Sequence, residues 1–272
     1  MPWTNKHLTW LVKTPEALTT ADGKSVEVWE LRHNDDPAIL KAWAKHFRNH
    51  YCLDTEIDVL KKGYKYSRKE YLENIKFPNR SSALGPSIRA GDFAEILVAD
   101  YLQFLLGYWV PRTRYGNKTI RDESSKGCDT LGFKILKEGR ESRGDTVALY
   151  EAKAQFSALK PSPRLQDAVD GSAKDHARKG ESLNAIKQHL FYSGSYEDAK
   201  KIERFQNPED HPYNESYGAV AAFSTSCFCK KTESKTDTSN HPHTSSLRLV
   251  VIRGDAMMDL VHELYRRAAD EA

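Results

Sequence analysis

The segment Thr146–Lys153, TVALYEAK, has an apolar strand pattern that ends in two charged residues. Alternate residues of an extended strand point to the same side of the sheet. Glu151 and Lys153 therefore share a side with the apolar Val147 and Leu149. A strand that only supports the core would carry such charges on its solvent side. The pattern predicts a strand end where a carboxylate and an ammonium group act together.

A second acidic residue is expected to meet this pair. Asp129 begins the apolar segment 129–136, and the residues between the two segments, KEGRESRGD, suit a hairpin turn. Antiparallel pairing brings the start of one strand beside the end of the other. Asp129 is therefore predicted to lie near Glu151 and Lys153.

Two carboxylates and a lysine at one point suit the metal-dependent hydrolysis of a phosphodiester. Carboxylate oxygens are preferred ligands of Mg²⁺ and Mn²⁺, and such an ion polarises a phosphate oxygen and lowers the pKa of a bound water. We predict Asp129, Glu151 and the backbone carbonyl of Ala152 as metal ligands. Lys153 would orient the water or stabilise the charge that develops on the phosphate.

The elements that must position these residues form a mixed α/β pattern. From residue 89 the periodicity predicts a helix, three strands, a helix, two strands and a helix. The expected strands are 108–114, 129–136, 146–153, 217–225 and 247–254, and the expected helices are 89–107, 164–205 and 255–269. This order favours a mixed central sheet flanked by helices. Residues 226–246 are polar and are expected to form a mobile, hairpin-like excursion.

A smaller α+β region, residues 1–80, is expected to precede the larger domain, residues 81–272. It would contain strands at 8–13 and 25–32 and a helix at 36–51.

Glu95 interrupts the first helix of the larger domain, which is otherwise apolar on nearly all sides. A buried carboxylate without a partner is costly. We therefore expect a metal ion or a lysine beside Glu95.

Asp129 and the tripeptide Glu151-Ala152-Lys153 resemble the D…(D/E)-x-K core of the PD-(D/E)xK nuclease superfamily. The resemblance implies a restriction-endonuclease-like fold, Mg²⁺ or Mn²⁺ as cofactor, and DNA as substrate. It also implies that Glu95 is a secondary metal ligand or a group that fixes Lys153.

Gln188 and Tyr192 match the Q-x-x-x-Y pattern that follows the catalytic strand in RecB-like members of this superfamily. By that resemblance they are expected to line the site and to contact DNA. Lys126 is a further candidate for contact with phosphates, as are Lys134 and Arg143.

Three segments, GDFAEILVADYL, KGCDTLGF and LYEAKAQFS, resemble the HamA family, the nuclease subunits of the Hachiman anti-phage defence system. The resemblance covers roughly residues 80–260. It implies a bacterial DNA nuclease that forms a heterodimer with a superfamily 2 helicase, HamB, which restrains it until DNA is engaged.

Other readings of the sequence remain open. The chain is a non-catalytic adaptor for DNA or a helicase if the nuclease residues are inactive, or a protein-interaction module if their charges only pair structurally. Cys227-x-Cys229 and His241-x-His243 suggest a zinc site, but their spacing departs from the usual pattern. The run 61–71, KKGYKYSRKEY, suits either a nucleic-acid strand or a protein partner.

The composition of the chain is compatible with each of these functions and does not distinguish them. A net charge of +3 permits contact with nucleic acid but does not demand it. No apolar run is long enough to cross a bilayer, so no membrane association is expected. The four cysteines are too few and too scattered for a disulfide framework, which predicts a cytoplasmic protein.

Overall fold

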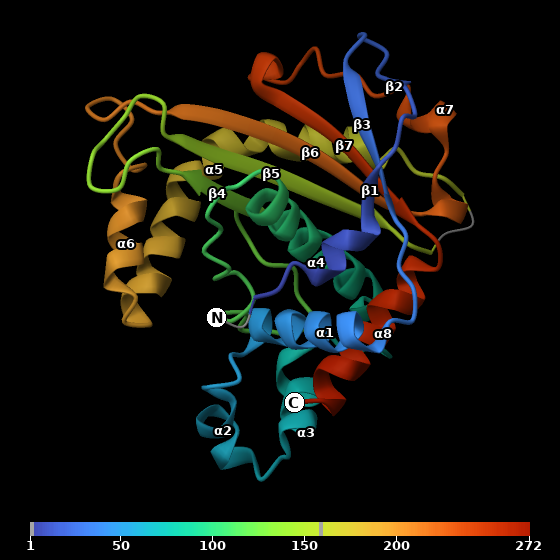
Figure 1. Cartoon of the computed structure of the whole chain (residues 1–272), viewed down its shortest axis with the longest axis vertical. Coiled ribbons are helices and arrows are strands. Elements are labelled where there is room, and N and C mark those ends of the chain that lie inside the picture. Colours follow the sequence, from blue (N-terminus) through green and yellow to red (C-terminus); the bar gives the residue numbers. More distant parts are fainter. Residues whose placement is uncertain (1–2, 158–159) are drawn as a thin grey trace.

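A computed structural model describes residues 3–157 and 160–272 of the chain. These residues form a seven-stranded sheet in the order β1-β3-β7-β6-β5-β4, with β2 paired to β3 outside this order (Figure 1). The strands are β1 (Leu11–Lys13), β2 (Leu18–Thr19), β3 (Ser25–Leu31), β4 (Thr130–Lys134), β5 (Thr146–Gln155), β6 (Asn214–Ser224) and β7 (Leu247–Gly254). The central strands β3, β7, β6 and β5 run parallel to one another, whereas β1, β2 and β4 are antiparallel to their neighbours.

Helices cover both faces of this sheet, which confirms the α/β core expected from the sequence. The first core cluster holds α1, α4 and α8 against one face, and the second holds α5 and α6 against the other. The α-helices are α1 (Pro37–Tyr51), α2 (Ile57–Leu60), α3 (Arg68–Tyr71), α4 (Gly85–Asp100), α5 (Arg164–Tyr192), α6 (Tyr196–Glu203), α7 (Lys230–Glu233) and α8 (Met257–Asp270). Short 3₁₀ segments are η1 (Lys6–Trp10), η2 (Lys62–Tyr64), η5 (Thr225–Cys227) and η6 (Thr244–Ser246), and π-helical turns are η3 (Leu72–Lys76) and η4 (Tyr101–Leu105).

Strand β5 extends beyond its edge partner β4. β4 pairs with Thr146–Tyr150 only, whereas β6 pairs with β5 along its whole length to Gln155. The register that joins Thr130 to Tyr150 brings Asp129 opposite Glu151. The second half of β5 therefore has an edge that β4 leaves open, and the predicted hairpin and its register are confirmed.

The region before residue 80 belongs to the same sheet and the same core. β3 pairs in parallel with β7, and α1 packs against α8 below the sheet in Figure 1. Phe47 and Tyr51 of α1 are fully buried, and both pack against Tyr265 of α8. The boundary expected at residue 80 falls in the loop before α4.

Two predicted strands are wrong in whole or in part. Residues 8–13 are expected to be extended, but η1 occupies their first half. This 3₁₀ turn places His7 in the core, where its Nε2 lies 2.9 Å from Asp100 Oδ2. Residues 108–114 form only an isolated bridge from Trp109 to Phe133. Pro111 cannot donate a hydrogen bond to a ladder, and Arg112 has a φ of 50°, which is not an extended conformation.

The predicted helix 164–205 and the predicted excursion 226–246 also need correction. Gly194, with a φ of 78°, separates α5 from α6, as glycine commonly does just after a helix. β6 and β7 are parallel, so residues 225–246 form a crossover and not a hairpin. This crossover contains α7 and is packed onto the molecule, since Glu233 and Thr238 are fully buried.

Candidate functional site

The three residues predicted to form the catalytic core lie together at the open edge of β5. The backbone N–H of Ala152 donates to Asp129 Oδ2 at 3.1 Å. The ammonium of Lys153 contacts the Glu151 carboxylate and lies 4.0 Å from Asp129 Oδ2. Glu151 is buried, whereas the Lys153 side chain is 33% exposed. The lysine therefore extends from the buried Glu151 toward solvent.

Helix α5 covers Glu151 through a glycine. A Cβ atom at Gly171 would lie 2.5 Å from Glu151 Oε1, so a larger residue at this position would displace the carboxylate or the helix. Glu151 Oε2 has no hydrogen-bond partner among the described residues. Burial raises the pKa of Glu151 to about 7, and the nearby charge of Asp129 adds to this effect.

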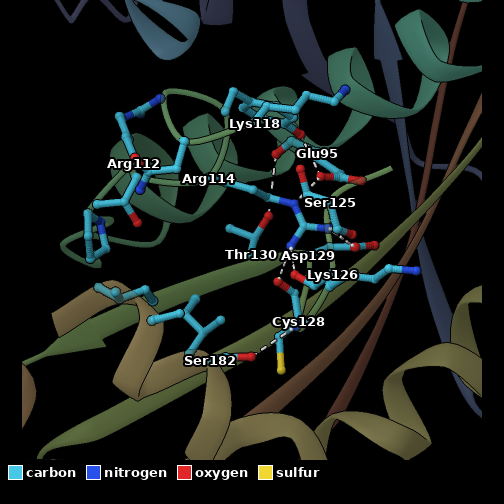
Figure 2. A pocket seen from close by; sticks show the side chains of 18 of the residues that line it. Glu95, Arg112, Arg114, Lys118, Ser125, Lys126, Cys128, Asp129, Thr130 and Ser182 are labelled. Carbon is cyan, nitrogen blue, oxygen red and sulfur yellow. Dashed lines mark hydrogen bonds and ion pairs between the residues drawn. The ribbon is translucent and has the colours of Figure 1, made fainter. Parts of the chain in front are cut away.

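Arg114 joins Glu95 to the catalytic core. Its Nε lies 2.7 Å from Glu95 Oε2, and its Nη2 lies 2.8 Å from Asp129 Oδ1. Figure 2 shows the guanidinium between these two carboxylates. The same group donates to the backbone carbonyls of Ser125, Lys126 and Cys128. Glu95 thus has a cationic partner, as its burial predicts, but the partner is an arginine.

Glu95 also accepts a hydrogen bond from the hydroxyl of Tyr115. Burial raises the pKa of Glu95 to about 8, although the positive charge of Arg114 opposes this shift. Lys118 pairs with Asp92 of α4 at 2.9 Å, with both side chains almost fully buried. These contacts hold the loop that carries Arg114 firmly against α4.

A cavity of about 460 Å³ lies beside this arginine. Glu95, Arg114, Lys126 and Asp129 all line it, together with apolar side chains of α4 and α5. Glu151 and Lys153 are not among its lining residues. The cavity therefore approaches the site from the Arg114 side, whereas Lys153 reaches solvent elsewhere.

Asp175 of α5 is a further acidic residue near the site that the sequence reasoning missed. It is fully buried, and neither of its carboxylate oxygens has a hydrogen-bond partner among the described residues. Its cationic neighbour Arg178 is 4.0 Å away. Burial raises the pKa of Asp175 to about 7, and the charge of Asp129 contributes. Asp175 lies on the same stripe of α5 as the buried Leu165 and Ala168, a signal visible in the sequence.

Arg114 could not have been found in the same way. It follows Pro111 in an irregular loop, and only the folded chain brings it to Glu95 and Asp129.

The residues predicted to contact nucleic acid lie farther out. Lys126 is exposed beside the cavity, and its amine points away from Asp129 in Figure 2. Gln188 and Tyr192 are exposed near the C-terminal end of α5. Because an α-helix rises 1.5 Å per residue, they lie roughly 25–30 Å along the axis from Gly171. The structure does not bring them to the carboxylates.

A second group of potential metal ligands lies between the N-terminal region and α4. His46, His50 and Asp100 place ligand atoms within 4.8 Å of one another, close enough to hold a metal ion. The guanidinium of Arg112 also contacts this group, at 2.6 Å from Asp100 Oδ1 and 2.8 Å from His50 Nε2. His7 binds the other oxygen of Asp100 at 2.9 Å. A cation and a set of hydrogen bonds therefore already satisfy the buried carboxylate.

The zinc site suggested by the cysteine and histidine pairs is absent from the described residues. Cys227 and Cys229 form no ligand group with His241 or His243. His241 lies 3.3 Å from the hydroxyl of Ser172, whereas His243 stacks on another side chain.

Comparison with known proteins decides the family. A family model for HamA matches residues 5–268, nearly the whole chain. The chain belongs to the HamA family. HamA is the Hachiman defence protein, which works in a system that includes a partner. The match also includes the N-terminal region, which lies outside the part of the chain that carries the resemblance noted above. No curated protein matches the chain.

No helix among the described residues combines the length and the apolar composition needed to cross a bilayer.

Proposed function

We propose that this HamA-family chain is a metal-dependent DNA nuclease that acts in Hachiman defence beside a superfamily 2 helicase. The meeting of Asp129, Glu151 and Lys153 at the open edge of β5 carries this proposal. The chain would act in the cytoplasm as one subunit of a heterodimer. Its four cysteines are free, as expected in a reducing compartment.

The donor atoms at this edge suit Mg²⁺ or Mn²⁺. Asp129 and Glu151 supply carboxylate oxygens, and Ala152, the residue after Glu151 on β5, supplies a backbone carbonyl that lies 3.4 Å from Lys153 Nζ. All are hard oxygen donors. Glu151 Oε2 is buried without a hydrogen-bond partner, which is costly unless another group compensates it. We propose these three residues as ligands, with Glu95 as a secondary ligand.

A metal ion at these ligands would polarise the phosphate and lower the pKa of a bound water. Lys153 contacts Glu151 and reaches toward solvent, so its ammonium is placed to hold the attacking water or the phosphate. Although burial opposes the shift, the charges of Glu151 and Asp129 raise the pKa of Lys153. The side chain therefore stays protonated at neutral pH and acts as a hydrogen-bond donor.

Nucleic-acid contacts are proposed on two surfaces. Lys126 lies beside the cavity and suits a phosphate near the cleavage point. Gln188 and Tyr192 suit DNA that extends along α5, because Tyr192 is 80% exposed. At their distance from Gly171, they contact nucleotides several steps from the cleaved bond.

The test compares DNA cleavage by the wild-type chain with Glu151→Gln and Lys153→Ala, alone and with the helicase, in Mg²⁺ and in EDTA. Lys174→Ala is the matched control, because Lys174 is an exposed lysine on α5. We expect cleavage to require the metal, to fall by at least about a hundredfold in both site variants, and to persist in the control. Cleavage that survives Glu151→Gln would contradict the assignment.

A second candidate function is a non-catalytic adaptor that binds DNA or a helicase. One observation favours it: Glu95, Asp129 and Glu151 each already pair with Arg114 or Lys153. Titration with Mn²⁺ by calorimetry separates the two. Binding that Asp129→Asn abolishes supports the nuclease, whereas a folded chain that takes up no ion supports the adaptor.

A further inference from the structure

A group of metal-ligating side chains lies on the α5 side of the sheet, outside the site described above. It comprises His176 of α5, Glu215 of β6 and His243 of the crossover, with one ligand atom of each within 4.8 Å of the others. His176 Nδ1 lies 3.5 Å from Glu215 Oε2. Three segments that are distant in the sequence thus converge on one point. The His176 side chain is 54% exposed, so an ion has access from solvent.

Neighbouring side chains hold this group in place. The ring of Tyr217 stacks on the ring of His243, with centroids 4.4 Å apart and an angle of 5° between the planes. The hydroxyl of Tyr217 donates to Glu215 and lies 3.2 Å from His176 Nδ1. All three ligands therefore contact Tyr217, which restricts their motion before any ion binds.

The chemistry of the group points to a particular class of ion. Two imidazole nitrogens and one carboxylate form a ligand set that Zn²⁺ accepts, with a fourth position left for water. Mg²⁺ and Ca²⁺ prefer sites built entirely from oxygen. The group thus differs in selectivity from the oxygen-rich edge of β5.

A lysine competes for the same carboxylate. Lys179, one turn beyond His176 on α5, pairs with Glu215 Oε1. The second oxygen of Glu215, Oε2, accepts from the Tyr217 hydroxyl and faces His176. The Lys179 ammonium reduces the affinity of Glu215 for a cation, so binding is expected to be weaker than at a structural zinc site.

We propose that His176, Glu215 and His243 bind a Zn²⁺-type transition-metal ion that fastens the crossover to α5. The ion would link the segment after α7 to the helix that covers Glu151. An ion that binds only the folded chain raises its stability by mass action. This inference does not depend on nuclease activity.

Calorimetric titration of the full chain with Zn²⁺ tests the proposal, supported by visible absorption of Co²⁺ as a probe of tetrahedral nitrogen ligands. The titration uses an Asp129→Asn, Glu151→Gln background, which removes the oxygen-rich site. We expect one ion per chain and at least a tenfold loss of affinity in both His176→Ala and His243→Ala. His211→Ala is the matched control, because His211 is an exposed histidine that pairs with Glu141 and is expected to leave binding unchanged.

Thermal unfolding provides a readout apart from titration. Zn²⁺ is expected to raise the Tm of the background chain and not that of its His243→Ala form, when each chain is compared with its own Tm in EDTA. Lys179→Met removes the competing ammonium and is expected to tighten Zn²⁺ binding severalfold. The proposal is overturned if the background chain binds no Zn²⁺, if His243→Ala binds it equally well, or if His46→Ala abolishes binding in its place.

Discussion

Gly171 of α5 lies directly against the carboxylate of Glu151, with no room between them for a methyl group. The helix therefore sets the position of Glu151 by close backbone approach. Gly180, nine residues further along the same helix, has open space at this position, where a methyl group would meet no atom within 4 Å. The two glycines form a natural pair for testing whether this contact supports the site.

Gly171→Ala is expected to lower the free energy of unfolding by about 1–3 kcal/mol, the usual cost of overpacking, and to reduce cleavage by displacing Glu151. Gly180→Ala is expected to raise it by up to about 1 kcal/mol, because alanine favours the helix. Urea unfolding and a DNA-cleavage assay measure both effects. Equal stability changes in the two variants would show that the close approach is unimportant.

Arg114→Met is expected to destabilise the fold by about 3 kcal/mol or more, because it leaves the largely buried carboxyl groups of Glu95 and Asp129 without their cation. Asp129 would lose its ion pair, and three backbone carbonyl groups would lose a donor. Arg121→Ala, in the same loop, removes a guanidinium that is partly exposed and serves as the control. Denaturant midpoints of the two variants give the comparison; indistinguishable midpoints would count against a structural role for Arg114.

Asp100→Asn is expected to lower the free energy of unfolding by about as much as Arg114→Met does. Asp100 holds Arg112 and His7 in the core through an ion pair and a hydrogen bond. Although burial opposes the shift, His46 and Arg112 hold the pKa of Asp100 well below its usual range. The stabilisation is therefore present above the unfolded pKa near 4 and is lost as the pH falls further. Urea unfolding at pH 7 and at lower pH measures it. Asp58→Asn, which removes an exposed carboxylate, should change stability little.

Stability is expected to fall with rising pH because of Glu233. This fully buried residue of α7 accepts the backbone N–H of Leu165 at 2.9 Å, near the start of α5, and burial raises its pKa to about 7. The unfolded chain loses this proton near pH 4.5, before the folded chain does. The free energy of unfolding therefore declines between these values, by up to about 3 kcal/mol.

Glu233→Gln keeps an oxygen for the Leu165 N–H and removes the titration. Chemical unfolding of the wild type and this variant at pH 5, 6, 7 and 8 measures the difference. The gap between the two should widen in favour of the variant up to about pH 7 and then level off. A constant gap would mean that Glu233 titrates normally in the folded chain.

The sequence was most informative where pattern and chemistry coincide. The alternation in β5 and the hairpin before it predict that Asp129 lies opposite Glu151, and the structure has this register. The polar residues of the crossover misled the prediction, because composition does not reveal that β6 and β7 are parallel. Glu233 becomes buried only because the crossover packs on α5, and the sequence does not indicate this contact.

The role of Arg114 could not be predicted from the sequence. Its role depends on a loop that lacks periodicity and is held by contacts such as the Lys118–Asp92 pair. Asp175, by contrast, could have been predicted as a buried acidic residue, since it lies on the buried stripe of a helix that the sequence does predict.

The pairing of β3 with β7 has a consequence for how the chain folds. It joins Val28 to Val251, near opposite ends of the sequence, within one ladder. Contacts of such long sequence separation form late, because a large loop must close before they become favourable. During synthesis, β1 and β3 must wait for almost the whole chain to emerge before their sheet is complete. The exposed edge of β3 is therefore the surface most open to misassembly in a nascent chain.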